Sequence, residues 1–121
     1  MKAALCLVLM LTAFGSARAD DFDHFLSGFR AAMSTRNFEQ IADLTHLPFL
    51  FENRELDREA YIRAIPKLFD LSVSRCLATT PPLPEDGAQV LFCTPYAFYL
   101  RPGADGKWKL EAFNADGEDM P

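Results

Sequence analysis

The sequence predicts an α+β domain in which a curved antiparallel sheet of about four strands wraps around three helices. Apolar residues recur every three or four positions between residues 21 and 77, the period of amphipathic helices. Beyond residue 88 they alternate with a period of two, which is typical of strands. A proline-rich segment separates the two regions, so helices precede strands along the chain.

The first two helices are predicted from spacing and capping. The first begins at Asp21, and its apolar positions fall on one face: Phe22, Phe25, Leu26, Phe29 and Met33. Asn37 followed three residues later by Gln40 resembles a capping box that opens a short second helix. Pro48 ends the helical region, and residues 49–51 are predicted to form a short buried strand.

The middle of the chain is predicted to be mainly helical. Residues 53–56 read as a polar turn, and Asp57 caps a longer helix that continues to about Leu77. Pro66 lies inside that helix, where a proline costs about 3 kcal/mol, so we expect a kink or two abutting helices. Residues 78–87, with three prolines, are expected to form a stiff connection that ends in a turn.

The last third of the chain reads as three strands. Residues 90–93, 96–100 and 107–112 alternate in the manner of strands. Pro95 requires a sheet edge or a bend between the first two strands. Residues 102–106 contain two glycines that can take positive φ, so they predict a hairpin turn before the closing strand.

Residues 1–19 have the pattern of a signal peptide. A lysine at position 2 precedes the apolar run 3–14, and Ala17-Arg18-Ala19 is a small-x-small cleavage site. The apolar run is too short for a membrane span, which needs about 20 residues. We therefore expect a periplasmic or secreted protein with no membrane anchor after cleavage.

The remaining chain is expected to form one domain over residues 20–115, followed by a flexible acidic tail over residues 116–121. The whole chain has a formal net charge of −5, and loss of Lys2 and Arg18 with the signal makes it more acidic. This charge argues against nucleic acid or an anionic lipid surface as a partner, because both require a basic patch.

Two cysteines, Cys76 and Cys93, remain after cleavage, and an even pair in an oxidising compartment predicts a disulfide. The closed loop of roughly 18 residues gives a stabilisation of about 3 kcal/mol in the chain-entropy model. A redox pair is the alternative, but it normally has Cys-x-x-Cys spacing, which these residues lack.

The element order and several local segments resemble the nuclear transport factor 2-like, or cystatin-like, superfamily. Residues 37–44 followed by Leu47-Pro48-Phe49 resemble its second helix and first strand. Residues 58–61 and 67–70 resemble its third helix, and residues 106–110 its closing strand. The resemblance implies a cone-shaped fold with a cavity between helices and sheet, often paired as a homodimer through the sheet. It implies no single activity.

That cavity is where the resemblance places a small apolar ligand. The residues that we expect to line the cavity are mostly aromatic: His46, Tyr61, Phe25, Phe29, Tyr96 and Phe98. Each has a structural alternative: the phenylalanines of the first helix as packing residues, Tyr61 as a core residue, and His46 as a backbone-bonded turn residue. No cofactor is expected.

Catalysis would have to rest on acid–base groups, because the chain has no Gly-x-Ser-x-Gly elbow, phosphate loop or dinucleotide fingerprint. The candidates are Asp43, His46, Tyr61, Tyr96 and Tyr99, which depart from the superfamily's catalytic pattern. We therefore assign no catalytic residue. The two histidines lie far apart without a pairing motif, so no metal site is expected.

The run 96–100 is apolar on both strand faces, although a sheet with one solvated face should alternate. We expect the second face to be covered by self-association through Leu91, Ala97 and Tyr99. A foreign protein partner or the chain's own tail is the alternative cover.

Three functions remain open at this point. The first is an exported domain that binds a small ligand and has no evident catalytic machinery. The second is a protein-binding accessory module that uses the aromatic sheet face. The third is a cofactor-free isomerase, lyase or hydrolase in the cone.

Overall fold

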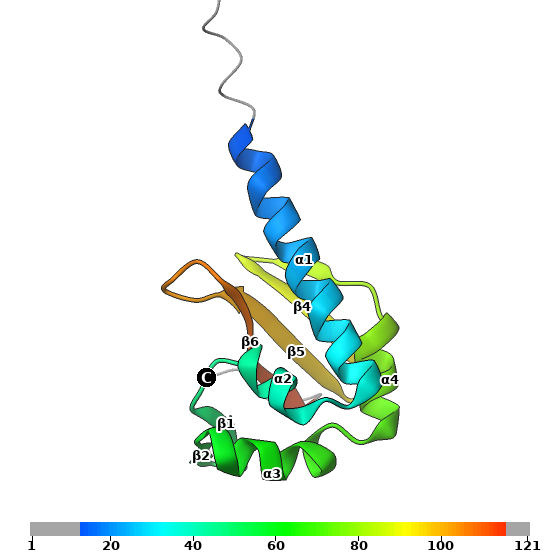
Figure 1. Ribbon diagram of the computed structural model, residues 1–121. Coiled ribbons are helices and arrows are strands. Elements are labelled where there is room, and N and C mark those ends of the chain that lie inside the picture. Colours follow the sequence, from blue (N-terminus) through cyan, green and yellow to red (C-terminus); the bar gives the residue numbers. More distant parts are fainter. Residues whose placement is uncertain (1–12, 116–121) are drawn as a thin grey trace, which may run out of the picture.

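The computed structural model of the protein describes the backbone of residues 13–115 and the side chains of residues 20–115. This part of the chain is α+β, with four helices and two antiparallel sheets of two and four strands, as the sequence predicts at the level of class. Three of the helices lie over one face of the larger sheet, and the helix of residues 58–68 lies at one end of the molecule, beside the smaller sheet (Figure 1). Most of the predicted signal peptide (residues 1–12) and the predicted tail (residues 116–121) lie outside the described residues.

Helix α1 (Ala13–Thr35) begins earlier than the expected Asp21 and passes through the predicted cleavage site. No proline interrupts this stretch. Helix α2 (Phe38–Asp43) follows after a single left-handed residue, Arg36, with φ of 54°. The predicted cap of α2 is present, because the Asn37 side chain accepts a hydrogen bond from the backbone N–H of Gln40 at 3.1 Å.

The predicted strand β1 (Phe49–Phe51) is confirmed, but the prediction of a polar turn up to Leu56 is wrong. Residues Arg54–Leu56 form a second strand, β2, which pairs antiparallel with β1. Glu52 and Asn53 both have positive φ, so two residues suffice to reverse the chain. The pair at this turn is Glu52-Asn53 and not the Asn-Gly or Asp-Gly that usually indicates such a hairpin.

The predicted division of the long helix is confirmed. Helix α3 (Arg58–Leu68) contains Pro66 in its last turn, and a separate helix, α4 (Leu71–Thr79), follows. The break falls at Asp70, whose side chain accepts a hydrogen bond from the N–H of Val73 at 2.9 Å and so caps the new helix.

The four-stranded sheet has the order β3-β4-β5-β6, with every neighbouring pair antiparallel. Its strands are β3 (Leu83–Glu85), β4 (Ala88–Cys93), β5 (Tyr96–Pro102) and β6 (Trp108–Ala115). The expectation of an irregular connection up to Gly87 is therefore wrong for β3. Pro84 has no N–H to donate to a ladder, and it is tolerated because β3 is an edge strand.

The strand register separates an inner face, against the helices, from an outer face. Leu91 pairs with Phe98 and is fully buried in the main core, so its predicted place beside Tyr99 is wrong. A slip of one residue between β4 and β5 moves a side chain to the opposite face, and periodicity alone does not set that register. The outer face instead carries these apolar side chains: Leu83, Val90, Phe92, Ala97 and Tyr99.

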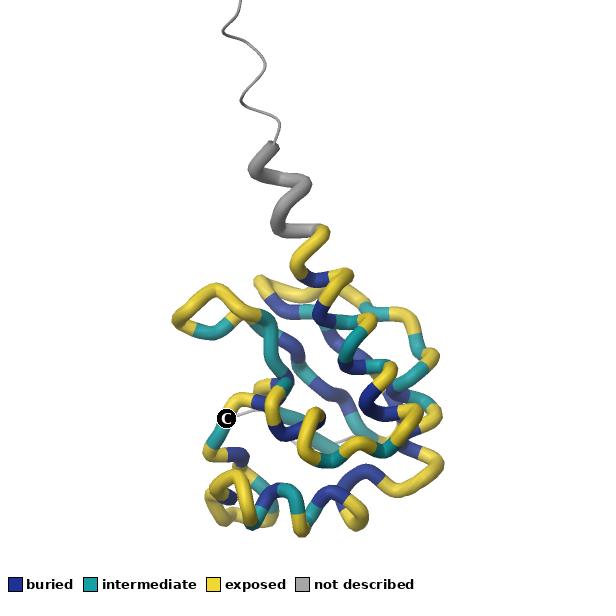
Figure 2. Tube along the Cα trace, in the orientation of Figure 1, coloured by how far each residue is buried: buried dark blue, intermediate teal, exposed yellow. Residues whose placement is uncertain are grey.

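Aromatic rings fill the space between the helices and the inner face. Phe113 on β6 lies 5.6 Å from Phe98 and 5.9 Å from Phe49, measured between ring centroids. Phe69, at the end of α3, lies 5.6 Å from Phe98. Figure 2 shows the buried residues concentrated along the sheet and the helix sides that face it. Among the described helices, none is long and apolar enough to cross a membrane.

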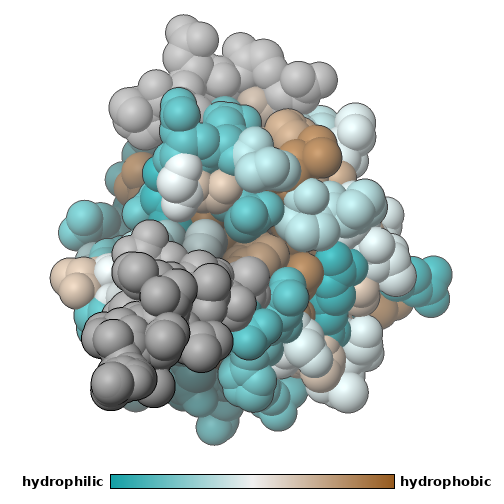
Figure 3. All heavy atoms as spheres, turned by 90° about the horizontal axis from the view of Figure 1, so that it is seen from above, coloured by the Kyte–Doolittle hydropathy of each residue, from teal (hydrophilic) through white to brown (hydrophobic). Residues whose placement is uncertain are grey.

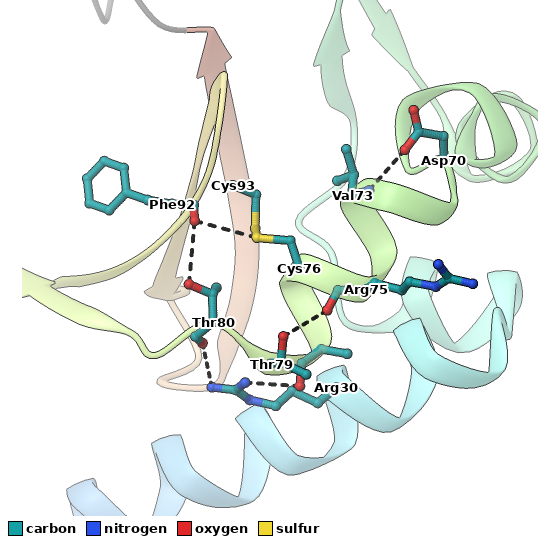
Figure 4. The surroundings of a disulfide bond; sticks show 10 residues. Arg30, Asp70, Val73, Arg75, Cys76, Thr79, Thr80, Phe92 and Cys93 are labelled. Atoms are coloured by element: carbon teal, nitrogen blue, oxygen red, sulfur yellow. Dashed lines mark hydrogen bonds between the residues drawn. A yellow bond between two sulfur atoms is a disulfide. The ribbon is translucent and has the colours of Figure 1, made fainter.

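The predicted disulfide is confirmed, with the Cα atoms of Cys76 and Cys93 5.8 Å apart, and it joins α4 to the end of β4 (Figure 4). Arg30 reaches across from α1 to the same end of α4. It donates hydrogen bonds to the carbonyl oxygens of Ala78 at 3.0 Å and Thr80 at 2.8 Å. A covalent bond and a cationic cap thus hold α1, α4 and β4 together.

We expect the double substitution Cys76→Ser and Cys93→Ser to lower the free energy of unfolding by about 3 kcal/mol, because it frees a closed loop in the unfolded chain. Urea unfolding followed by circular dichroism measures the change. Wild-type protein in reductant is the matched control and should lose a similar amount. An unchanged unfolding midpoint in both samples would contradict the assigned role.

Candidate functional site

Four of the residues that we expected to line a ligand cavity lie in the packed core: Phe25, Phe29, Tyr61 and Phe98. Phe25 and Phe29 stack on each other along α1, with centroids 5.6 Å apart. Phe29, Tyr61 and Phe98 have no exposed surface, and Phe25 is 8% exposed. Phe29, Tyr61 and Phe98 therefore contact protein on all sides, so a ligand can reach them only if the core rearranges.

The Tyr61 hydroxyl forms a buried hydrogen bond with the Thr45 hydroxyl at 3.0 Å. Thr45 also donates to the carbonyl oxygen of Ile41 at 2.7 Å, so Tyr61 donates to Thr45. Burial raises the pKa of Tyr61, and the hydrogen bond to Thr45 only partly offsets that increase. Tyr61 therefore stays neutral and links α3 to the segment after α2.

The other acid–base candidates lie away from Tyr61. His46 is exposed, and its backbone N–H donates to the carbonyl oxygen of Leu110 at 2.8 Å. Asp43 is exposed and forms an ion pair with Arg58 at 2.6 Å. Tyr96 is half-buried, with its ring 5.8 Å from that of Phe113. Within residues 20–115 no group of three His, Cys, Asp or Glu side chains is arranged to hold a metal ion.

We expect Tyr61→Phe to weaken the fall of stability at alkaline pH. In wild type the unfolded chain ionises near the ordinary pKa of 10.0, whereas the raised pKa keeps folded Tyr61 neutral. The unfolded state therefore binds fewer protons above that pH, and the free energy of unfolding falls as pH rises.

The measurement is urea unfolding at about pH 7 and about pH 11, with Tyr99→Phe as the control. Tyr61→Phe should lose about 1 kcal/mol at neutral pH from the missing hydrogen bond, yet fall less steeply with pH. A slope equal to that of wild type would refute the role of Tyr61.

A hollow lies elsewhere, at the end of the molecule where α1 meets two turns. It has a volume of about 690 Å³ and lies between the β3–β4 turn and the loop from β5 to β6. We call it the rim hollow. The side chains that give it its chemical character are Asp21, Glu85, Asp86, Gln89 and Trp108. Pro84 and Pro102 add apolar wall.

Trp108 also lines a second, smaller hollow next to the rim hollow. The smaller hollow holds about 400 Å³ and is lined by Phe25, His24 and Lys107, among others. The Trp108 ring packs edge-on against Phe22, with centroids 4.7 Å apart, so α1 fixes its orientation. Trp108 is half-buried and lines both hollows.

Three acidic residues, Asp21, Glu85 and Asp86, line the rim hollow, and no Lys or Arg is among the described residues that line it. The Arg101 guanidinium lies close by, because it donates a hydrogen bond to the carbonyl oxygen of Asp86 at 3.2 Å. Asp105, in the adjoining loop, has a pKa lowered mainly by the hydrogen bond that the Lys107 backbone N–H donates to its carboxylate, so it adds negative charge nearby. Figure 3 views the molecule from this end, where hydrophilic side chains predominate among the coloured residues.

The rim hollow is not apparent from the sequence patterns. Those patterns place Trp108 in the closing strand without a functional role and indicate only a connection at the Glu85-Asp86-Gly87 turn. Two sequence features could have indicated the hollow. Trp108 follows the glycine-containing turn 102–106, and the turn 85–87 contains two acidic residues. Only the sheet topology brings those two turns to the same end, beside Asp21 of α1.

Comparison of the chain with known protein families, with curated proteins and with solved structures gave no significant match.

Proposed function

We propose that this protein is an exported binding protein for a small organic cation, which it holds in the rim hollow without catalysing a reaction. One observation carries the proposal: a hollow of about 690 Å³ is lined by Trp108 and three acidic residues, and none of the described residues that line it is basic. The volume falls in the range of small-molecule sites, which is about 300–1,000 Å³.

The chemistry of the lining fits a ligand with an apolar body and a positive charge. An indole face attracts a cation by about 0.5–2 kcal/mol, depending on how far the cation is desolvated. The carboxylates of Asp21, Glu85 and Asp86 add attraction from the surrounding walls. The proline side chains give the apolar body a surface without polar groups to desolvate.

Export supports the same proposal. The signal-like pattern of residues 1–19 and a disulfide between Cys76 and Cys93 both suit an oxidising compartment outside the cytoplasm. We further propose that the fold is the nuclear transport factor 2-like cone. Support comes from helices placed on one face of the four-stranded sheet, and an experimentally determined structure compared with that superfamily would test it.

Trp108 is the only tryptophan in the chain, so its fluorescence reports on the rim hollow directly. We expect benzyltrimethylammonium to change the emission saturably, because the cation contacts the indole face. The variant Glu85→Gln with Asp86→Asn should weaken binding by about tenfold. Tyr99→Phe, on the outer face, is the matched control and should bind like wild type.

The neutral carbon analogue of the probe, neopentylbenzene, separates charge recognition from simple apolar contact. Binding of this analogue as tightly as the cation would contradict the proposed ligand class. The absence of a saturable change with either compound would contradict the site itself.

A second candidate function is self-association through the outer face of the sheet. The supporting observation is that Leu83 and Phe92 remain 52% and 49% exposed there, next to the half-buried Tyr99. A symmetric contact between two outer faces would cover these side chains.

Replacing Phe92 with Glu should dissociate such a dimer, because a two-fold interface meets each new charge twice in a low-dielectric setting. Sedimentation velocity of wild type, Phe92→Glu and Tyr99→Glu at micromolar concentration measures the assembly. Leu50→Glu, an exposed change on β1, is the control. A monomeric wild type would rule out this function.

A further inference from the structure

A groove of opposite character lies between the β1–β2 hairpin and α3, at the end of the molecule away from the rim hollow (Figure 1). It holds about 260 Å³. Its floor is apolar, formed by Phe51 and Leu56 with two alanines of α3. Its rim carries Arg54, Arg63 and Lys67. We call it the basic groove.

The sequence builds this groove by placing four α3 residues on one stripe. Ala60, Arg63, Ala64 and Lys67 are spaced three and four residues apart, so they share the side of the helix that faces the hairpin. The two alanines let the hairpin approach closely, and the two long cations stand at the edge. Arg54 joins them from β2.

Two of these cationic side chains, those of Arg54 and Arg63, form no polar contact that stabilises the described part of the fold. Within residues 20–115, no hydrogen bond or ion pair engages the side chain of Arg54 or Arg63. By contrast, Arg30 and Arg36 cap helix ends through backbone carbonyls. The rim also includes one acid, Glu52, whose carboxylate lies 3.9 Å from the Lys67 ammonium.

The net charge of the groove is therefore positive in a chain whose formal net charge is −5. Glu59 lies one turn before Arg63 on α3 but does not line the groove. An arginine fork matches a carboxylate in two parallel hydrogen bonds, and the apolar floor suits a hydrophobic side chain. The chemistry of the groove thus complements an acidic and apolar segment.

We propose that the basic groove docks an acidic peptide segment of a partner protein, with carboxylates on Arg54 and Arg63 and an apolar side chain on the floor. The side chains of an extended peptide point alternately to two sides. A peptide with alternating acidic and apolar residues can therefore direct its apolar side chains to the floor and its carboxylates to the arginines. This docking is independent of cation binding in the rim hollow, which lies at the other end of the molecule.

The test is fluorescence anisotropy with the fluorescein-labelled peptide Glu-Leu-Glu-Leu-Glu-Leu. Wild type should bind it, and Arg54→Glu with Arg63→Glu should weaken binding by at least about tenfold, because attraction becomes repulsion at two sites. Arg75→Glu changes an exposed arginine on α4 by the same charge and should have little effect. Thermal melts establish that all variants are folded.

Three results would overturn the proposal. Equal binding of Lys-Leu-Lys-Leu-Lys-Leu would show that charge does not select the ligand. Binding that appears only after Asp116→Asn, Glu118→Gln and Asp119→Asn are combined would assign the groove to the chain's own C-terminal segment. Self-association of wild type that the double arginine variant abolishes, without peptide binding, would assign it to a second copy.

Discussion

The packing of aromatic rings between the helices and the inner face of the sheet is the constraint on which the rest of the structure depends. Phe98 and Phe113 lie at its centre, in contact with rings from α3, β1 and β5. Protein interiors at this density leave little room for a ligand. The polar and charged side chains that a ligand could contact therefore lie in the turns and grooves at the ends of the domain. Trp108 lies at one end, and the α3 cations lie at the other.

Much of the fold could be read from local sequence signals. The caps at Asn37 and Asp57 and the helix division near Pro66 depend on residues a few positions apart. Errors arose where distant residues decide the outcome. Leu91 is a core residue because of strand register, which a periodicity argument does not fix. The error at the strand Arg54–Leu56, by contrast, has a local cause, because the turn before it places Glu52 and Asn53 at positive φ, a conformation that glycine usually supplies.

The candidate sites could be predicted less well than the fold, for a physical reason. Tyr61 and Phe98 belong to a residue class that both cores and ligand sites favour, and only burial distinguishes the two uses. The rim hollow combines residues from α1, the β3–β4 turn and the start of β6. Its acidic character, and the basic character of the groove along α3, emerge only when the chain brings dispersed charges to opposite ends.

The most direct test of the central claim, that ligands bind at the surface and not in the aromatic interior, is an NMR titration of isotopically labelled protein with benzyltrimethylammonium. The account predicts chemical-shift changes at the Trp108 indole, Asp21 and Gly106, while the ring signals of Tyr61 and Phe98 stay in place. Changes at Tyr61 and Phe98 that saturate together, with an unmoved Trp108 signal, would contradict it and return the binding site to the interior of the domain.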